Sequence, residues 1–211
     1  MIFEQYLELG LSNFTYLIGD EKMGQAAVVD PTASSVEAVQ ELLGKRSLTL
    51  KYIILTHTHF DHTGGLKPLA AKNMNAETVV HKLEVVSLKR MDVRIGVEVD
   101  DGNILKVGRV PLKVIHTPGH SPGSICILVQ NQLLLTGDTL FIGRCGRTDL
   151  PGGSPEAMFR SLSRRIKTLP EKIKVYPGHN YSNRNSSTIR EEKETNIALK
   201  PNSFEEFDRI I

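Results

Sequence analysis

Short apolar runs alternate with amphipathic stretches along the first 90 residues. The runs predict strands at 2–9, 14–19, 25–30, 51–55 and 78–80. Ser34 and Glu37 have capping-box spacing before an amphipathic stretch at 36–43, which predicts a helix that ends at Gly44. Further helices are expected at 66–72 and 82–90. The order of these elements predicts a sheet covered by helices.

The pattern of apolar and polar residues changes after Gly102, where strand-like apolar runs follow one another closely. They predict strands at 104–107, 111–115, 125–129, 132–135 and 172–176. Helices are expected at 154–167, with Ser154 as the cap, at 187–199 and from 203 onward. Two sheets with helices on both sides predict an α/β sandwich with four layers, in the order helix, sheet, sheet, helix (αββα). No linker or repeat interrupts the pattern, so we expect one domain over residues 1–211.

Composition narrows the class of protein. The net charge of +2, from 26 basic and 24 acidic residues, is too balanced for nucleic acid to be the main partner. No segment is apolar enough for a membrane span, and the N-terminus lacks an export signal, so we expect a cytoplasmic protein without a membrane partner. Two cysteines, Cys126 and Cys145, are too few for a disulfide framework. Monomer and homodimer both remain open.

The densest chemical signal is the segment Thr-His-Thr-His-Phe-Asp-His-Thr-Gly-Gly at residues 56–65. It holds three imidazoles and a carboxylate within six positions, namely His57, His59, Asp61 and His62. A solvated turn does not need this density, whereas a divalent metal binds imidazole nitrogen and carboxylate oxygen in a small volume. His57 and His59 are two residues apart at a strand end, so both can face one ion. Asp61 and His62 follow the turn and face a second position.

Three further metal-competent side chains each come directly after a predicted strand. They are His120 in Thr-Pro-Gly-His, Asp138 in Thr-Gly-Asp, and His179 in Tyr-Pro-Gly-His. Strand ends of one sandwich share an edge, so we expect these loops to meet the histidine-rich turn. The sequence therefore predicts a metal centre at that edge.

This motif and the order of the remote residues resemble the metallo-β-lactamase superfamily over nearly the whole chain. The resemblance implies that His57, His59 and His120 (the first set) hold one metal ion and that Asp61, His62 and His179 (the second set) hold another, with Asp138 as a bridge. Two divalent ions are therefore expected. Zn²⁺ is favoured, and Fe²⁺ and Mn²⁺ also suit mixed nitrogen and oxygen ligands.

A two-metal site of this kind has a defined chemistry. Water between two cations loses its proton near neutral pH and becomes a nucleophile, while one ion polarises the carbonyl under attack. Asp61 is expected to act catalytically as well, by orienting this hydroxide. Asp30 ends a strand before Pro31 and has two interpretations, either holding a ligand imidazole or capping the approach to a helix.

The loop at 137–153 resembles the glyoxalase II and persulfide dioxygenase branch, and its Cys-Gly-Arg-Thr-Asp core at 145–149 is most similar to the dioxygenases. Two functions follow. The first is hydrolysis of thioesters of the S-2-hydroxyacylglutathione type. The alternative is a glutathione persulfide dioxygenase in which His57, His120 and Asp138 bind one non-heme iron. The chain departs from full glyoxalase II enzymes because it ends soon after His179, without their C-terminal helical domain.

Candidate substrate-binding residues are Arg144, Arg147 and Tyr181, which follow metal-competent residues and could meet a small thiol-derived substrate such as a glutathione adduct. The competing interpretation pairs the arginines with Asp149 or a backbone carbonyl. His81, at the start of a charged helix, is expected to face solvent. Cys145 is expected to be a packing residue rather than a nucleophile.

Overall fold

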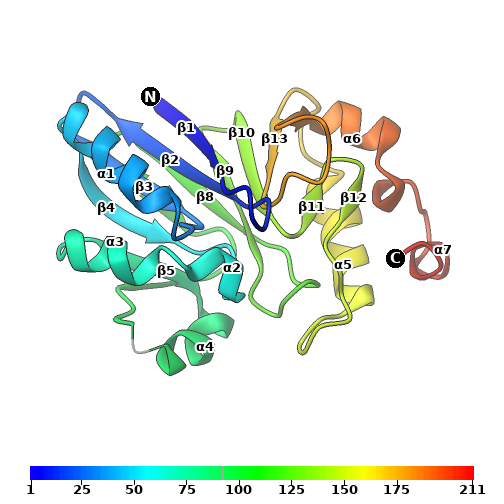
Figure 1. Ribbon diagram of the computed structural model, residues 1–211. Coiled ribbons are helices and arrows are strands. Elements are labelled where there is room, and N and C mark those ends of the chain that lie inside the picture. Colours follow the sequence, from blue (N-terminus) through cyan, green and yellow to red (C-terminus); the bar gives the residue numbers. More distant parts are fainter. Residues whose placement is uncertain (92) are drawn as a thin grey trace.

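Two mixed sheets lie face to face in the computed structural model, which describes residues 1–91 and 93–211, and helices cover both outer faces (Figure 1). Helices α1, α3 and α4 lie on one side and α5, α6 and α7 on the other (Figure 1). None of the helices within the described residues has the length and apolar character that a membrane crossing requires.

The first sheet has six strands in sequence order. They are β1 (Ile2–Leu7), β2 (Phe14–Asp20), β3 (Gln25–Val29), β4 (Thr49–Ile54), β5 (Glu77–His81) and β6 (Val97–Val99). The first three strands pair antiparallel and the last four parallel. The parallel crossovers contain α1 (Ser35–Lys45), α2 (Phe60–Thr63), α3 (Leu66–Lys72), the 3₁₀ turn η1 (Lys82–Glu84) and α4 (Val85–Arg90). Parallel strands need such crossovers, which place helices on the face of the sheet.

The second sheet has the order β14-β13-β10-β9-β8-β7. Its strands are β7 (Ile104–Val107), β8 (Val110–His116), β9 (Ile125–Val129), β10 (Leu133–Gly137), β13 (Lys174–Pro177) and β14 (Ser187–Thr188). A small hairpin of β11 (Leu140–Phe141) and β12 (Arg144–Cys145) follows β10. The helices are α5 (Pro155–Ser161), which continues into a π-helical turn (Leu162–Ile166), α6 (Ile189–Thr195), a 3₁₀ turn (Ile197–Leu199) and α7 (Phe204–Asp208).

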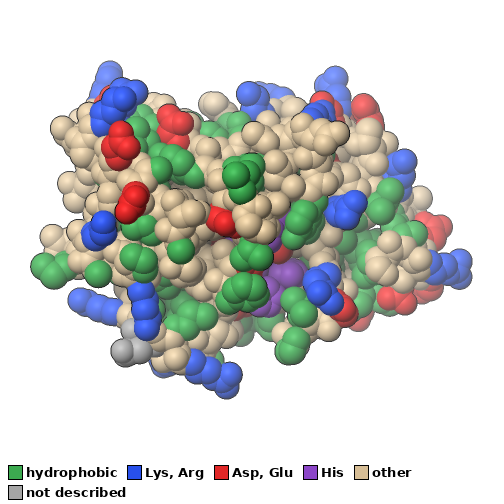
Figure 2. Space-filling view, viewed as in Figure 1, with side chains coloured by type: hydrophobic (Ala, Val, Ile, Leu, Met, Phe, Trp, Pro, Cys, Tyr) green, Lys and Arg blue, Asp and Glu red, His purple; other side chains and the backbone are tan. Residues whose placement is uncertain are grey.

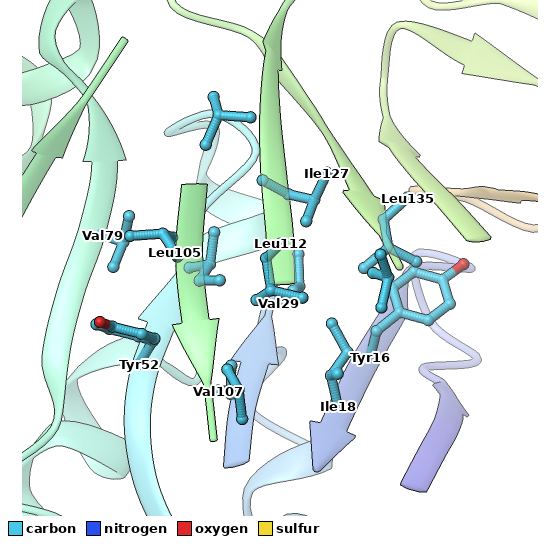
Figure 3. Close-up of a cluster of buried hydrophobic side chains, with 14 of the residues drawn as sticks. Tyr16, Ile18, Val29, Tyr52, Val79, Leu105, Val107, Leu112, Ile127 and Leu135 are labelled. Carbon is cyan, nitrogen blue, oxygen red and sulfur yellow. The ribbon is translucent and has the colours of Figure 1, made fainter. Parts of the chain in front are cut away.

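Three apolar clusters separate the four layers. Between the sheets, side chains from both inner faces interdigitate, among them Tyr16, Val29, Leu112 and Ile127 (Figure 3). A second cluster joins the outer face of the first sheet to its helices, and a third does the same for the second sheet. Both strands β2 and β9 lie between two of these clusters, so every residue of β2 and β9 is buried.

The predicted α/β sandwich is confirmed, and the differences are local. β1 ends at Leu7, two residues earlier than predicted, because the Glu8 carboxylate accepts hydrogen bonds from the backbone of Gly10 and Leu11 and starts a turn. The capping box before α1 is absent: Ser34 has helical backbone angles, and its hydroxyl contacts Thr32 instead. The predicted helix at 187–199 is reduced to α6, because the Asn196 side chain ends the helix and caps the next 3₁₀ turn. The sequence pattern missed the short strands β6, β11 and β12, and also β14, which occupies the first two residues of the helix predicted at 187–199.

Candidate metal centre

The histidine-rich segment leaves the carboxyl end of β4, a strand inside the first sheet. β3 and β5 pair with β4 on either side in parallel, so the next residues leave at the edge where parallel strands end. His57 and His59 lie in that exit loop, and Asp61 and His62 lie on the single turn of α2. The segment therefore presents four candidate ligands on one short connection, as its pattern predicts.

The other three residues reach the same edge from the second sheet. β8, β10 and β13 run in the same direction, because β9 lies antiparallel between β8 and β10 and β13 pairs parallel with β10. The loops after β10 and β13 are joined by a 2.8 Å hydrogen bond from the Gly178 amide to the Gly137 carbonyl. A Cβ atom at Gly178 would lie 2.4 Å from Asp138 Oδ1, so only glycine allows this approach.

All seven predicted residues come together, and their polar atoms form three overlapping groups. Atoms within each group lie within 4.8 Å of one another, and the groups are His57, His59 and His120; His57, His62 and Asp138; and Asp61, His62 and His179. The first and last groups are the two sets expected from the sequence. Asp138 lies between them: its Oδ1 is 3.3 Å from His62 Nε2, and its Oδ2 is 3.4 Å from both His120 Nε2 and His179 Nε2.

The donor chemistry fits divalent metal ions. His57 Nε2 and Asp138 Oδ1 are buried and have no hydrogen-bond partner among the described residues. His59 Nδ1 and His120 Nε2 face each other at 2.8 Å, and His62 Nε2 and His179 Nε2 at 3.3 Å. Buried imidazoles that turn their nitrogens toward one another satisfy few hydrogen bonds by themselves, whereas a cation between them accepts all their lone pairs.

Groups outside the two sets contact the Nδ1 atoms of three imidazole rings and so fix the orientation of these rings. Asp30 Oδ2 lies 3.0 Å from His62 Nδ1, so the structure supports the interpretation in which Asp30 holds an imidazole. His120 Nδ1 lies 2.8 Å from the Arg147 carbonyl, and His179 Nδ1 lies 3.1 Å from the Leu11 carbonyl. A ring whose Nδ1–H is donated to such a partner presents its Nε2 lone pair to a metal.

The surroundings in the centre shift the pKa values of its histidines in opposite directions. Burial lowers the pKa of His57 well below 6.5, so this ring is neutral and ready to ligate. Burial also lowers the pKa of His179, but hydrogen bonds to Asp138 and Asp61 outweigh it and raise the pKa to about 9. In the metal-free protein, His179 therefore carries a proton, and its positive charge takes the place of a metal ion's charge in the second set.

The metal-free protein should become less stable as the pH rises from 6.5 to about 9. The pKa of His179 rises from 6.5 to about 9 on folding, so its protonation favours the folded state fully below 6.5, and that contribution is lost as the pH passes 9. We expect the melting temperature in EDTA to fall by at least about 2 °C across this window. Saturation with Zn²⁺ should remove the fall, because a bound ion requires neutral imidazole. A flat profile in EDTA would contradict this assignment.

The centre opens into a cavity of about 540 Å³. Figure 2 shows the histidines in a hollow that hydrophobic and basic side chains surround. Arg144, Arg147 and Tyr181 line this cavity, as do Phe60 and Phe141. The Tyr181 ring stacks on His179 with 4.8 Å between the ring centroids and contacts Phe141 edge-on.

The two arginines differ in their contacts. Arg147 pairs with Asp149 through two hydrogen bonds of 2.6 Å, which matches the competing interpretation from the sequence. Arg144 is exposed and has no ion-pair partner within 1–91 and 93–211. Cys145 lines the same cavity, and burial raises the pKa of its thiol to about 12, so it is not a thiolate nucleophile near neutral pH.

Sequence patterns missed two buried polar residues beside the centre and misplaced one histidine. Glu84 accepts hydrogen bonds from Thr58 and Ser121, which neighbour the first set in sequence, and Asn13 contacts the second set. Both looked like ordinary turn or helix-surface residues, and no local signal marks them. The prediction that His81 faces solvent is wrong: it ends β5, is fully buried and stacks on His116 at 4.0 Å.

Comparison with known proteins agrees with this geometry. The family model described as the metallo-beta-lactamase superfamily matches residues 9–179. The mitochondrial persulfide dioxygenase ETHE1 of Mus musculus is 32% identical, in a match that covers 100% of this chain and 80% of the mouse protein. A hydroxyacylglutathione hydrolase of Pelagibacter ubique is 33% identical, with 94% of this chain and 92% of that protein covered.

Among solved structures, ETHE1 from Myxococcus xanthus superposes with a TM-score of 0.88 and 34% identity, over 100% of this chain and 89% of that one. The family model, the sequence identity over the whole chain and the structural superposition thus all indicate the same family. The chain is an enzyme of the metallo-β-lactamase superfamily, and it belongs to the branch that contains hydroxyacylglutathione hydrolases and persulfide dioxygenases.

Proposed function

We propose that this enzyme hydrolyses thioesters of the S-2-hydroxyacylglutathione type with a pair of divalent metal ions, Zn²⁺ foremost. The observation that carries the proposal is the complete second set beside the first. Asp61, His62 and His179 converge within 4.8 Å, although a dioxygenase with one iron uses only two histidines and one carboxylate. Hydrolysis by a bridging nucleophile uses both sets.

In this proposal each set would hold one ion, and Asp138, which lies between the sets, would serve both. The bound ions would supply a nucleophile by acidifying water and would stabilise negative charge on the thioester oxygen. Asp61 lines the cavity and has 16% of its side chain exposed, so a carboxylate oxygen that is not used for the ion can orient the attacking water. Asp30 and the Leu11 carbonyl keep His62 and His179 turned toward the centre.

The cavity wall suits an anionic thiol conjugate. Phe60, Phe141 and Tyr181 give the entrance an apolar and aromatic lining that excludes water from the reacting bond. Arg144, which has no ion-pair partner among the described residues, can offer its guanidinium to a carboxylate of the glutathione portion, which a planar fork binds through two hydrogen bonds. Arg147 assists through its backbone, since its carbonyl faces His120 and its side chain is occupied by Asp149.

A second candidate function is oxidation of a glutathione persulfide at a single iron held by His57, His120 and Asp138. The observation in its favour is that the mouse persulfide dioxygenase ETHE1 and ETHE1 from Myxococcus xanthus both match the whole of this chain at more than 30% identity. Cys145 and Arg147 of the segment at 145–149 line the cavity, where a difference between the two chemistries would act.

One experiment separates the two functions. Metal content is measured on the purified enzyme, which is then assayed for thioester hydrolysis without oxygen and for oxygen uptake with glutathione persulfide. We expect thiol release under anaerobic conditions, at a rate that follows the metal content. Oxygen consumption by protein with one iron, without anaerobic thiol release, would replace the hydrolase with the dioxygenase.

A further inference from the structure

The turn between β1 and β2, residues 8–13, lies against the loop that carries His179 (Figure 1). Two backbone hydrogen bonds join them: the Phe14 amide donates to Gly178 over 2.8 Å, and the Asn180 amide donates to Ser12 over 2.7 Å. The Leu11 carbonyl of the same turn faces His179 Nδ1. This N-terminal turn is therefore a structural support of the second set.

One side chain of the turn enters the centre itself. Asn13 is 1% exposed, and its Nδ2 lies 3.1 Å from Asp61 Oδ2. The same nitrogen lies 3.4 Å from His62 Nε2 and 3.4 Å from His179 Nε2. A single amide group thus contacts one polar atom of each member of the second set. The hydrogen bonds of Asn13 within the described residues include none to the first set.

The carbonyl oxygen of the Asn13 side chain indicates the role of the contacts that Nδ2 makes. Asn13 Oδ1 is buried and has no hydrogen-bond partner among residues 1–91 and 93–211. A buried, unsatisfied acceptor costs free energy, so an apolar residue would suit a merely structural turn better. The interactions of this side chain are all made through Nδ2, which points into the second set.

The bond to Asp61 is the one that a bound ion would leave intact. An ion in the second set takes the lone pairs of His62 and His179, which ends their contacts with the amide. A carboxylate oxygen has two lone pairs, so Asp61 Oδ2 can accept from Asn13 and still ligate. Asp61 lies on the four-residue helix α2, and Asn13 is its only amide or hydroxyl donor in the part of the chain that the structure describes.

We propose that Asn13 is a positioning residue for the second metal ion: its amide fixes the Asp61 carboxylate, so the N-terminal turn decides whether the centre holds one ion or two. This inference rests on the proposed metal pair. It assigns a role to a residue outside the seven candidate ligands. The first set has separate supports, among them the Arg147 carbonyl behind His120, and should be insensitive to Asn13.

The test is metal binding by Asn13→Leu, which keeps nearly the volume of the side chain and removes its donor. Metal-free protein is titrated with Zn²⁺ by calorimetry and with Co²⁺ by absorption spectroscopy, which reports each ion as it binds. We expect the second ion to bind about 10–100-fold more weakly and the first to bind as in the wild type. Asn73→Leu, which removes an asparagine side-chain hydrogen bond at the C-terminal end of α3, is the matched control and should bind both ions normally.

Two wild-type affinities in Asn13→Leu would overturn the proposal, and so would an equal loss of both ions, which indicates a general change in folding. Melting in EDTA identifies a folding defect, and Asn13→Ala, which requires less space, then replaces the leucine variant in the same titration. The outcome is separate from the proposed reaction. If the wild type binds two ions and hydrolyses thioesters while Asn13→Leu binds both ions normally, this inference fails alone; if the titrations behave as expected without thioester hydrolysis, the proposed function fails alone.

Discussion

Asp138→Ala is expected to lower the turnover of the enzyme by at least about 100-fold and to reduce the number of bound ions. Changes to residues that merely orient metal ligands cost 10–100-fold, so loss of a shared ligand should cost more. The carboxylate oxygens of Asp138 lie 3.3–3.4 Å from nitrogens of His62, His120 and His179, which belong to both sets. Without this side chain, no described carboxylate lies between the two sets to balance two cations.

The measurement combines metal content by mass spectrometry with kcat/KM for the thioester. Glu37→Ala, in the first turn of α1, removes an exposed carboxylate that does not line the cavity and should change neither quantity. Circular dichroism and a single cooperative melting transition show whether the variant folds. A folded Asp138→Ala enzyme that binds two ions and keeps its kcat/KM within a few-fold of the wild type would remove Asp138 from the centre.

The convergence of the seven residues could be predicted because each carries a local signal. His57, His59, Asp61 and His62 are dense enough in sequence to indicate a metal by themselves. His120, Asp138 and His179 each follow a recognisable strand, and strand direction then dictates the edge they reach. Regular hydrophobic periodicity predicts strands well, so the sandwich and the location of its functional edge followed from the sequence.

Supports of the centre could not be predicted, because their roles depend on contacts between distant segments. Asn13 and Asp61 are 48 positions apart, and Glu84 and Ser121 are 37 apart. Nothing in the local sequence distinguishes a buried asparagine from one in an exposed turn. His81 shows the same limit: it precedes a charged helix, yet the ring packs inward because it belongs to the last inward position of β5.

Glu84 joins the two loops that carry the first set. Its Oε2 accepts from the hydroxyl of Thr58, which lies between His57 and His59. Its Oε1 accepts from the Ser121 hydroxyl at 2.6 Å and the Gly123 amide at 2.9 Å, beside His120. The carboxylate is 4% exposed, so these bonds have little competition from water. It is therefore placed to keep the loop after β4 and the loop after β8 at a fixed separation.

Glu84→Ala is expected to destabilise the protein by about 2–4 kcal/mol, because three buried donors lose their acceptor and a cavity remains. With the two loops released, the first ion should bind about 10–100-fold more weakly. Denaturant unfolding in EDTA gives the stability, and Zn²⁺ titration of the metal-free protein gives the affinity. Unchanged binding of the first ion in a destabilised variant would limit Glu84 to a role in folding.

Glu84→Gln is the matched variant, and it should recover most of both losses. Its amide oxygen can accept from Ser121 and Gly123, while its NH₂ group faces Thr58, whose hydroxyl can rotate and accept. Because the three hydrogen bonds survive without the negative charge, we expect a stability within about 1 kcal/mol of the wild type and nearly normal Zn²⁺ affinity. A glutamine variant as defective as the alanine variant would show that the charge of Glu84, rather than its hydrogen bonds, acts on the first set.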